Sequence, residues 1–484
     1  MEQSQLIELI STLNTEEKEH IRQFAVIPFI NSGKMKAFVL PLLDICLNHS
    51  DNGFPQSLAK QTVFALLFPR QEFIDGKLEK VMVEAHKVVR TVLLLLYYLR
   101  EDNEFQQGFD YSQIVRIRGL SIRYQHLLMR LKKKQEDGQR KNANYFHQQF
   151  QLENAIHDEE SLHNQKKGDL NIPNVLYTLQ LHGHLNRLAL LNRFLLQRKV
   201  AKLDIPETLK PILEENALSD MYLEQSPALR INHAIFYLLN KERPESSDIR
   251  LLLDLLRQQE QYLDRESLQE FYTYLRNLCI LVLSADIEKI EIEFTLHELY
   301  KDNLKKGYLH NEGKLLPSRY WAVSSNAVRV KEFDWALEFI EKYKFEVIGE
   351  NENQDIYRLN LANYLFGVGA FSECLDNIPP SSPFVDYLLT GKRLEIKAYY
   401  ELQSDLLSFK LEAFKVFLSR TSPKLLSETQ RQIHSDFANL LHQILNSLPG
   451  DPKRSNLLVS RIQEKKQSAE WRWLLEKAKE LKDK

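Results

Sequence analysis

The sequence contains few of the residues that interrupt helices. Glycine occurs 15 times and proline 16 times in 484 residues, about 3% each, whereas average proteins contain roughly 7% and 5%. No stretch of the sequence that is long enough to form a strand shows the alternation of apolar and polar residues that a half-buried strand needs. This scarcity of breakers and of strand patterns argues against a β-sheet architecture and favours helices.

Cysteine is scarce as well. The three cysteines, Cys46, Cys279 and Cys374, lie far apart, and each falls within an apolar helical pattern. Their spacing implies no disulfide framework. It predicts buried thiols in a reducing compartment.

The chain also lacks long hydrophobic runs and an excess of charge of one sign. The longest apolar run, 88–99, is interrupted by Arg90 and is far short of the roughly 20 residues that span a bilayer. Residues 1–10 lack the basic start and apolar core of a secretory signal. Lysine and arginine number 64 and aspartate and glutamate 66, a net charge of −2, so no global field attracts nucleic acid or anionic lipid. We expect a cytoplasmic protein without membrane association.

Apolar residues recur three and four positions apart, as on the helical faces of amphipathic helices. Leu251, Leu252, Leu255 and Leu256 form one such set. This periodicity predicts an all-α protein. Because 484 residues exceed what one compact core usually holds, we expect several domains or an extended α-solenoid.

Residues 1–102 are predicted to form an N-terminal helical domain. Asn14, with Glu17 three residues later, has the pattern of a capping box, and Pro69 stops a later helix. The polar segment 101–110 lacks periodicity and is predicted to be a linker.

Two further regions follow the linker. Residues 111–165 are predicted to form a charged helical hairpin of two long helices joined near Gly138. Residues 173–484 are predicted to form an α-solenoid that ends in capping helices.

Three helix-turn-helix units between Tyr320 and about Leu418 share one pattern of residue sizes. A small residue is expected where the second helix of each unit crosses the first, and Ala336, Cys374 and Ser408 take this position at spacings of 38 and 34 residues. On these residues the stretch resembles a degenerate tetratricopeptide array, whose period is about 34. Ser324 and Ile396 stand where such repeats usually have glycine, and no proline closes the first unit.

A second resemblance concerns the beginning of the chain. The Pro-Phe-Ile-Asn turn at 28–31 and the Leu-Phe-Pro stop at 67–69 are similar to the front end of a family of uncharacterised bacterial helical proteins. This resemblance implies no activity.

The resemblance to tetratricopeptide repeats implies a non-catalytic scaffold or adaptor that binds a protein or peptide partner in a groove. First helices line the concave side of such arrays, and tyrosine, tryptophan and arginine are the residues that dominate binding interfaces. The predicted protein-binding residues are Tyr320, Trp321, Arg329, Tyr357, Arg358, Tyr364, Arg393 and Tyr400. For each of them, packing in the core is the competing interpretation. The sequence specifies neither the partner nor an oligomeric state.

A basic segment suggests an alternative function. Residues 116–141 contain nine lysines and arginines against Glu136 and Asp137. A nucleic-acid-associated regulator could use such residues on phosphates, and an acidic partner could bind them too. The candidate contacts are Arg116, Arg123, Arg130, Lys134 and Lys141, of which the first three recur every seven residues. The competing interpretation is a solvated face that opposes the acidic segment 153–160.

Motifs for catalysis and for cofactors are missing from the sequence. It has no phosphate-binding loop, no nucleophile elbow, no His-Glu-x-x-His and no Cys-x-x-Cys. Glu160 and His163 have the Glu-x-x-His form of di-iron bundles, but no long core helix supplies a second pair. We therefore expect no enzyme activity, no cofactor and no metal.

Overall fold

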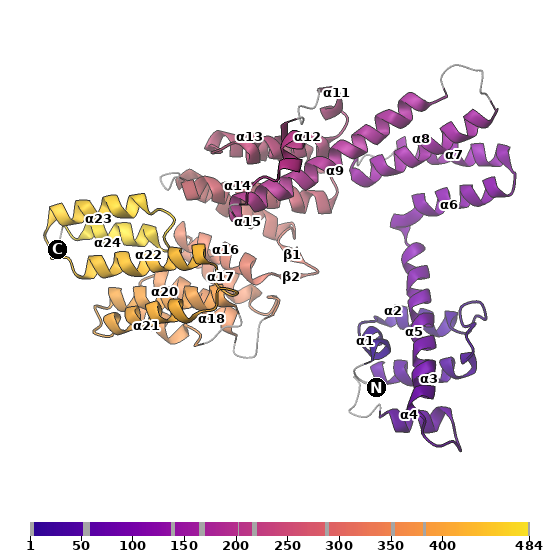
Figure 1. The fold of residues 1–484 in the computed structure, drawn as a ribbon, viewed down its shortest axis with the longest axis horizontal. Helices are drawn as coiled ribbons and strands as arrows, with labels where there is room; N and C mark the ends of the chain where they lie inside the picture. The colour runs from indigo at the N-terminus through magenta and orange to yellow at the C-terminus, as the bar shows by residue number, and fades with distance from the viewer. Residues whose placement is uncertain are drawn as a thin grey trace. The chain divides into compact units, whose positions relative to one another are not determined.

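The computed structural model describes residues 4–51, 59–136, 141–163, 170–201, 203–214, 220–285, 290–349, 354–380 and 384–482. These residues are mainly helical, which confirms the all-α prediction (Figure 1). The strands among them are β1 (His310–Asn311) and β2 (Lys314–Leu315), a short antiparallel pair in which His310 lies opposite Leu315. The chain divides into two compact units: unit 1 is Met1–Gln139 with Ala143–Gly183, and unit 2 is Arg140–Asn142 with His184–Lys484.

Unit 1 begins with five helices around one apolar core. They are α1 (Gln5–Ser11), α2 (Thr15–Phe24), α3 (Lys36–Asp51), α4 (Lys60–Leu67) and α5 (Asp75–Tyr98). The predicted capping box is confirmed: the Asn14 side chain accepts a hydrogen bond from the Glu17 backbone N–H at 2.8 Å, and the Glu17 carboxylate accepts one from the Asn14 N–H at 3.0 Å. Ile10, Ile21, Val39 and Leu78 are among the buried residues of this core.

The rest of unit 1 differs from two predictions. The segment predicted to be a linker contains the start of α6 (Glu104–Ile117), because Phe105 and Phe109 pack against a small core with Val115 and Tyr124. The first helix of the predicted hairpin is broken: α6 ends before Gly119, whose φ of +74° no helix accommodates, and α7 (Ser121–Glu136) begins after it. The remaining helices are α8 (Ala143–His163) and α9 (Ile172–Ala201), which runs on into unit 2.

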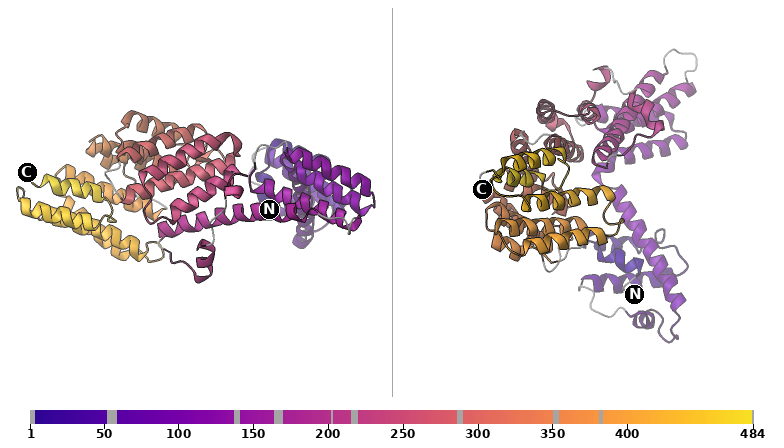
Figure 2. Two further views of the ribbon diagram at one scale, coloured as in Figure 1. Left: turned by 90° about the horizontal axis from the view of Figure 1, so that it is seen from above. Right: turned by 60° about the vertical axis from the view of Figure 1, so that its left-hand side comes forward.

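Unit 2 is a succession of helices joined by short connections. After the short α10 (Lys210–Glu214) and α11 (Asp220–Leu223), the helices are α12 (Pro227–Asn240), α13 (Ser246–Gln259), α14 (Arg265–Ala285), α15 (Ile290–Lys305), α16 (Pro317–Arg329), α17 (Phe333–Tyr343), α18 (Asp355–Gly367), α19 (Phe371–Asn377), α20 (Val385–Glu401), α21 (Leu407–Arg420), α22 (Glu428–Leu445), α23 (Pro452–Glu464) and α24 (Trp471–Glu480). Each helix from α12 to α24 contacts the next one, and Figure 2 shows them side by side.

The three predicted helix-turn-helix units correspond to α16–α17, α18–α19 and α20–α21. Ala336 and Cys374 are fully buried, as their predicted role requires, but Ser408 is exposed. In the third unit the large side chains of Leu407 and Leu411 are buried instead. The prediction that Ser408 is the small residue at the helix crossing is therefore wrong, because the face of α21 that packs in the core carries leucines.

One backbone motif recurs at the end of the first helix in all three units. Lys331, Gly369 and Gln403 have left-handed φ angles of 64°, 83° and 52°. In each case the next N–H donates to the carbonyl five residues back: Glu332 to Ala327, Ala370 to Leu365 and Ser404 to Tyr399. This is the Schellman geometry of a helix C-terminus, and the three left-handed residues are again 38 and 34 positions apart.

Candidate binding surfaces

All eight predicted protein-binding residues lie in unit 2, and the structure does not gather them into one cluster. Tyr320 belongs to the core: it is fully buried, and its hydroxyl donates to the Ile340 carbonyl at 2.7 Å. Trp321 is half-buried, with its ring 6.4 Å from that of Tyr387. Tyr364 is half-buried beside Phe333 at 6.5 Å.

Three of the others make contacts that tie the helices together. The Tyr357 hydroxyl donates to Glu341 at 2.6 Å. Arg358 donates to the Asp376 carbonyl at 3.1 Å, near the end of α19. The Tyr400 ring lies 5.1 Å from Trp473 in an edge-on arrangement.

Arg393 takes part in an ion cluster that holds the start of α24 against α20. Its Nε lies 3.1 Å from Glu470, and Lys397 lies 2.8 Å from the other oxygen of the same carboxylate. Burial alone would raise the pKa of the Glu470 carboxyl, but Lys397 and Arg393 outweigh this and lower it to about 2. The carboxylate is therefore ionised at neutral pH and anchors α24.

The last of the eight, Arg329, lines a pocket of about 570 Å³ formed by α14, α15, α16 and α24. Ile280, Leu283 and Leu296 supply an apolar part of its lining, with Ile280 exposed and the two leucines buried. Trp471 and Trp473 line it from α24. The pocket therefore combines aliphatic and aromatic side chains with charged ones.

The charged groups of this pocket are arranged around Glu293. Arg329 lies 3.7 Å from its Oε1, and Arg472 bonds to the same oxygen. The Glu293 side chain is largely buried, whereas that of Arg329 is 45% exposed. Two arginines share one carboxylate, so this group of three residues carries a net positive charge. We call these residues, with Ile280 and Trp471, the α14–α24 pocket.

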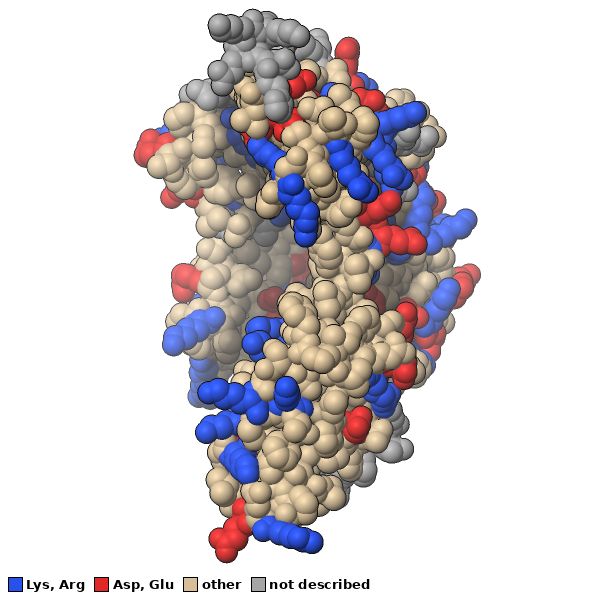
Figure 3. Space-filling view, turned by 90° about the vertical axis from the view of Figure 1, so that its right-hand side faces the viewer, with Lys and Arg blue, Asp and Glu red and all other residues tan. Residues whose placement is uncertain are grey.

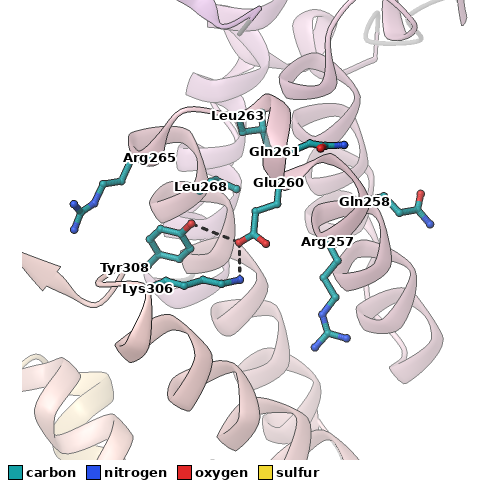
Figure 4. Close-up of a pocket in the computed structure, with 9 residues that line it drawn as sticks. All are labelled: Arg257, Gln258, Glu260, Gln261, Leu263, Arg265, Leu268, Lys306 and Tyr308. Carbon is teal, nitrogen blue, oxygen red and sulfur yellow. Dashed lines mark hydrogen bonds and ion pairs between the residues drawn. The ribbon is translucent and has the colours of Figure 1, made fainter. Parts of the chain in front are cut away.

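A second cavity in unit 2, of about 740 Å³, is lined by the end of α13, the start of α14 and the end of α15 (Figure 4). At its centre Glu260 Oε1 lies 2.7 Å from Lys306 Nζ and accepts a hydrogen bond from the Tyr308 hydroxyl at 3.5 Å. Lys306 also lies 3.0 Å from Asp302. Burial lowers the pKa of Lys306, but its hydrogen bonds to Glu260 and Asp302 outweigh this effect. The net pKa is therefore raised, and the lysine stays charged.

The basic segment of unit 1 is partly neutralised within that unit. Arg116 lies at the end of α6, 4.0 Å from Asp158, whereas Arg123, Arg130 and Lys134 lie on α7. Because Gly119 separates the two helices, the spacing of seven residues does not place the three arginines on one helix face. Lys134 pairs with Glu104.

A neighbouring lysine shows the predicted opposition to the acidic segment. Lys132 lies 2.8 Å from Glu153. Arg123 and Arg130 are exposed. Lys141 follows α7 in the sequence and precedes α8, but it belongs to unit 2. On the face shown in Figure 3, lysine and arginine side chains are interspersed with aspartate and glutamate.

Exposed apolar residues occur at two places in unit 1 that the predictions do not name. At the end of α5, Leu94 is 60% exposed and Tyr97 62%, and at the α6–α7 corner, Ile117 is 85% exposed and Ile122 74%. The sequence signal for the α5 residues is the apolar run 88–99, which contains Leu94 and Tyr97. Among the described residues, no helix combines the length and the apolar character needed to cross a bilayer.

Two of the α8 side chains considered as metal ligands, Glu153 and His157, make contacts within unit 1. Glu153 accepts a hydrogen bond from Asn171 at 2.7 Å as well as pairing with Lys132, and His157 Nδ1 lies 2.6 Å from the Leu170 carbonyl oxygen. The side chain of His163 lies outside the described residues. Within the described part of the chain, no three His, Cys, Asp or Glu side chains are grouped so that they could hold a metal ion.

Comparisons of this chain with protein-family models, with curated proteins and with solved structures find no match.

Proposed function

We propose that the protein is a non-catalytic scaffold that binds a protein or peptide partner through unit 2. The observation that carries this proposal is the α14–α24 pocket, where Arg329, Arg472 and Trp471 surround an aliphatic surface. Tryptophan and arginine are enriched among the residues that dominate binding energy, above all where they border a pocket that a partner can desolvate. An apolar centre with charged residues around it is also the usual composition of a protein interface.

The fold supports the same proposal. Contacts run from each helix to the next through α24, and α16 also contacts α18, which in turn contacts α20. Together with the three recurring Schellman ends, this pattern is what a tetratricopeptide-like α-solenoid would show. Solenoids of this kind expose extended surfaces on which partners bind. The three cysteines are free and buried, which supports a reducing compartment such as the cytoplasm.

We favour protein binding over the nucleic-acid alternative because of the ion pairs in unit 1. Arg116 and Lys134, two of the five candidate phosphate contacts, lie beside carboxylates of α8 and α6. A phosphate would have to displace these carboxylates before it could bind. The charge available to a nucleic acid is therefore smaller than the sequence alone indicates.

A photo-crosslinking experiment tests the proposal directly. The photoreactive residue benzoylphenylalanine would replace Ile280, which is exposed and borders the pocket. A matched control would carry it in place of Leu251, an exposed apolar residue on α13. We expect a defined protein to be crosslinked from position 280 and not from position 251. The proposal fails if both positions give the same products, or if position 280 gives none.

A further inference from the structure

The cavity at the ends of α13 and α15 contains two exposed arginines, Arg257 and Arg265. Neither of them forms an ion pair with any of the described residues. Figure 4 shows them on opposite sides of the Glu260–Lys306 pair. The cavity therefore presents two separated positive charges with a neutralised pair between them.

The polar groups of the lining match the needs of a peptide. Gln258 and Gln261 lie in the lining with Arg257, and each side-chain amide can both donate and accept a hydrogen bond, as a peptide backbone requires. Arginine binds carboxylates with two parallel hydrogen bonds. A chain segment with carboxylates some residues apart could reach both arginines while its backbone contacts the glutamines.

The same lining is poorly suited to single-stranded nucleic acid. Binding of that kind relies on aromatic rings on which bases stack. The aromatic residue of this cavity, Tyr308, is buried, and its ring already stacks against Tyr272 at 5.6 Å. A continuous row of phosphates would also pass the fixed carboxylate of Glu260, whereas spaced carboxylates can avoid it.

We propose that this cavity is a binding site for an acidic peptide segment, held by Arg257 and Arg265 on either side of the Glu260–Lys306 pair. The site uses none of the residues of the α14–α24 pocket. It would give the protein a second recognition element, selective for carboxylates.

The test measures fluorescence anisotropy of a short labelled peptide of alternating glutamate and serine, titrated with the full-length protein. The double variant Arg257→Gln, Arg265→Gln should bind the peptide roughly tenfold more weakly, the combined effect of two lost exposed charge pairs. The single variant Arg257→Gln, at an exposed position, should show part of this loss. Arg243→Gln, an exposed arginine near the opposite end of α13, is the control and should bind normally.

A variant that is expected to bind the peptide more tightly provides a stricter test. Glu260→Gln removes the one carboxylate in the lining, so it should tighten peptide binding. Absence of peptide binding, or equal affinity in the wild type and the double variant, would overturn the proposal. The proposal would also be overturned if the protein bound a labelled single-stranded RNA more tightly than the peptide and the double variant no longer bound that RNA. Because the lining residues differ, failure here leaves the proposed function of the α14–α24 pocket intact.

Discussion

Replacement of Glu470 by glutamine should destabilise unit 2 in a way that depends on pH. Glu470 is the shared partner of Arg393 and Lys397, whose side chains are only 13% and 10% exposed. Glutamine keeps the shape and one acceptor oxygen but removes the charge. The variant leaves two nearly buried cations without the carboxylate that neutralises them.

The size of the effect follows from the pKa of the carboxyl. Burial opposes ionisation, but Lys397 and Arg393 lower the pKa from 4.5 to about 2, which corresponds to about 3 kcal/mol of stabilisation at neutral pH. Loss of one partner of a buried ion pair typically costs about 3–5 kcal/mol. Since Glu470 is 24% exposed, we expect the lower end of that range.

The sign of the pH dependence follows from the lowered pKa. The folded state holds the carboxylate ionised at a pH where the unfolded chain has already taken up a proton. The stabilisation is therefore complete well above pH 4.5 and is lost as the pH falls toward 2. Near pH 3 the difference between wild type and variant should be smaller than at neutral pH by about 2 kcal/mol.

Urea denaturation followed by tryptophan fluorescence measures this difference. All four tryptophans, Trp321, Trp335, Trp471 and Trp473, lie in unit 2, so the signal reports this unit alone. Glu476→Gln, at an exposed position on the same helix, serves as the control and should change little. A Glu470→Gln variant as stable as the wild type, or one whose deficit is equal at both pH values, would refute the assignment of Glu470 as the anchor of α24.

Two further predictions concern packing. Ala336→Leu adds volume at a fully buried contact on α17 and should destabilise unit 2 by roughly 1–3 kcal/mol in the same fluorescence assay; an unchanged transition would mean that the helix pairs are aligned wrongly. Leu94→Asp, at an exposed position of α5, should change the stability of unit 1 by less than about 0.5 kcal/mol, whereas Val92→Asp, fully buried on the same helix, should cost roughly 3 kcal/mol or more. Circular dichroism during urea denaturation compares the two aspartates, and equal losses would contradict the exposure of the α5 face.

Local features of the structure could be predicted from sequence because their causes lie within a few residues. The capping box depends on Asn14 and Glu17, which are three positions apart. The helical pairs of unit 2 follow from apolar periodicity and from breaks in it. Even so, Lys331 and Gln403 adopt the left-handed turn conformation without being glycine, so glycine marks only one of the three turns.

Features that depend on tertiary contact were missed or placed wrongly. The sequence predicts a linker at 101–110, where α6 begins, because apolar residues such as Phe105 and Phe109 are sparse there and pack only against neighbouring helices. Ser408 was misplaced because size and spacing do not fix the rotation of a helix. The α14–α24 pocket joins Arg472 to Glu293 across 179 positions, and no local pattern connects residues so far apart in the chain.

Whether the α14–α24 pocket is the binding site can be decided by comparing the affinity of the partner captured at position 280 for the wild type and for Arg329→Ala. Arg329 is partly exposed in the pocket, so its removal should take away binding energy while the fold persists. By isothermal titration calorimetry, we expect Arg329→Ala to lose more than about 1 kcal/mol of binding free energy, the scale of an interface hot spot, and Arg243→Ala to bind normally. Unchanged affinity in an Arg329→Ala variant with wild-type stability would contradict the claim that unit 2 binds its partner through the α14–α24 pocket.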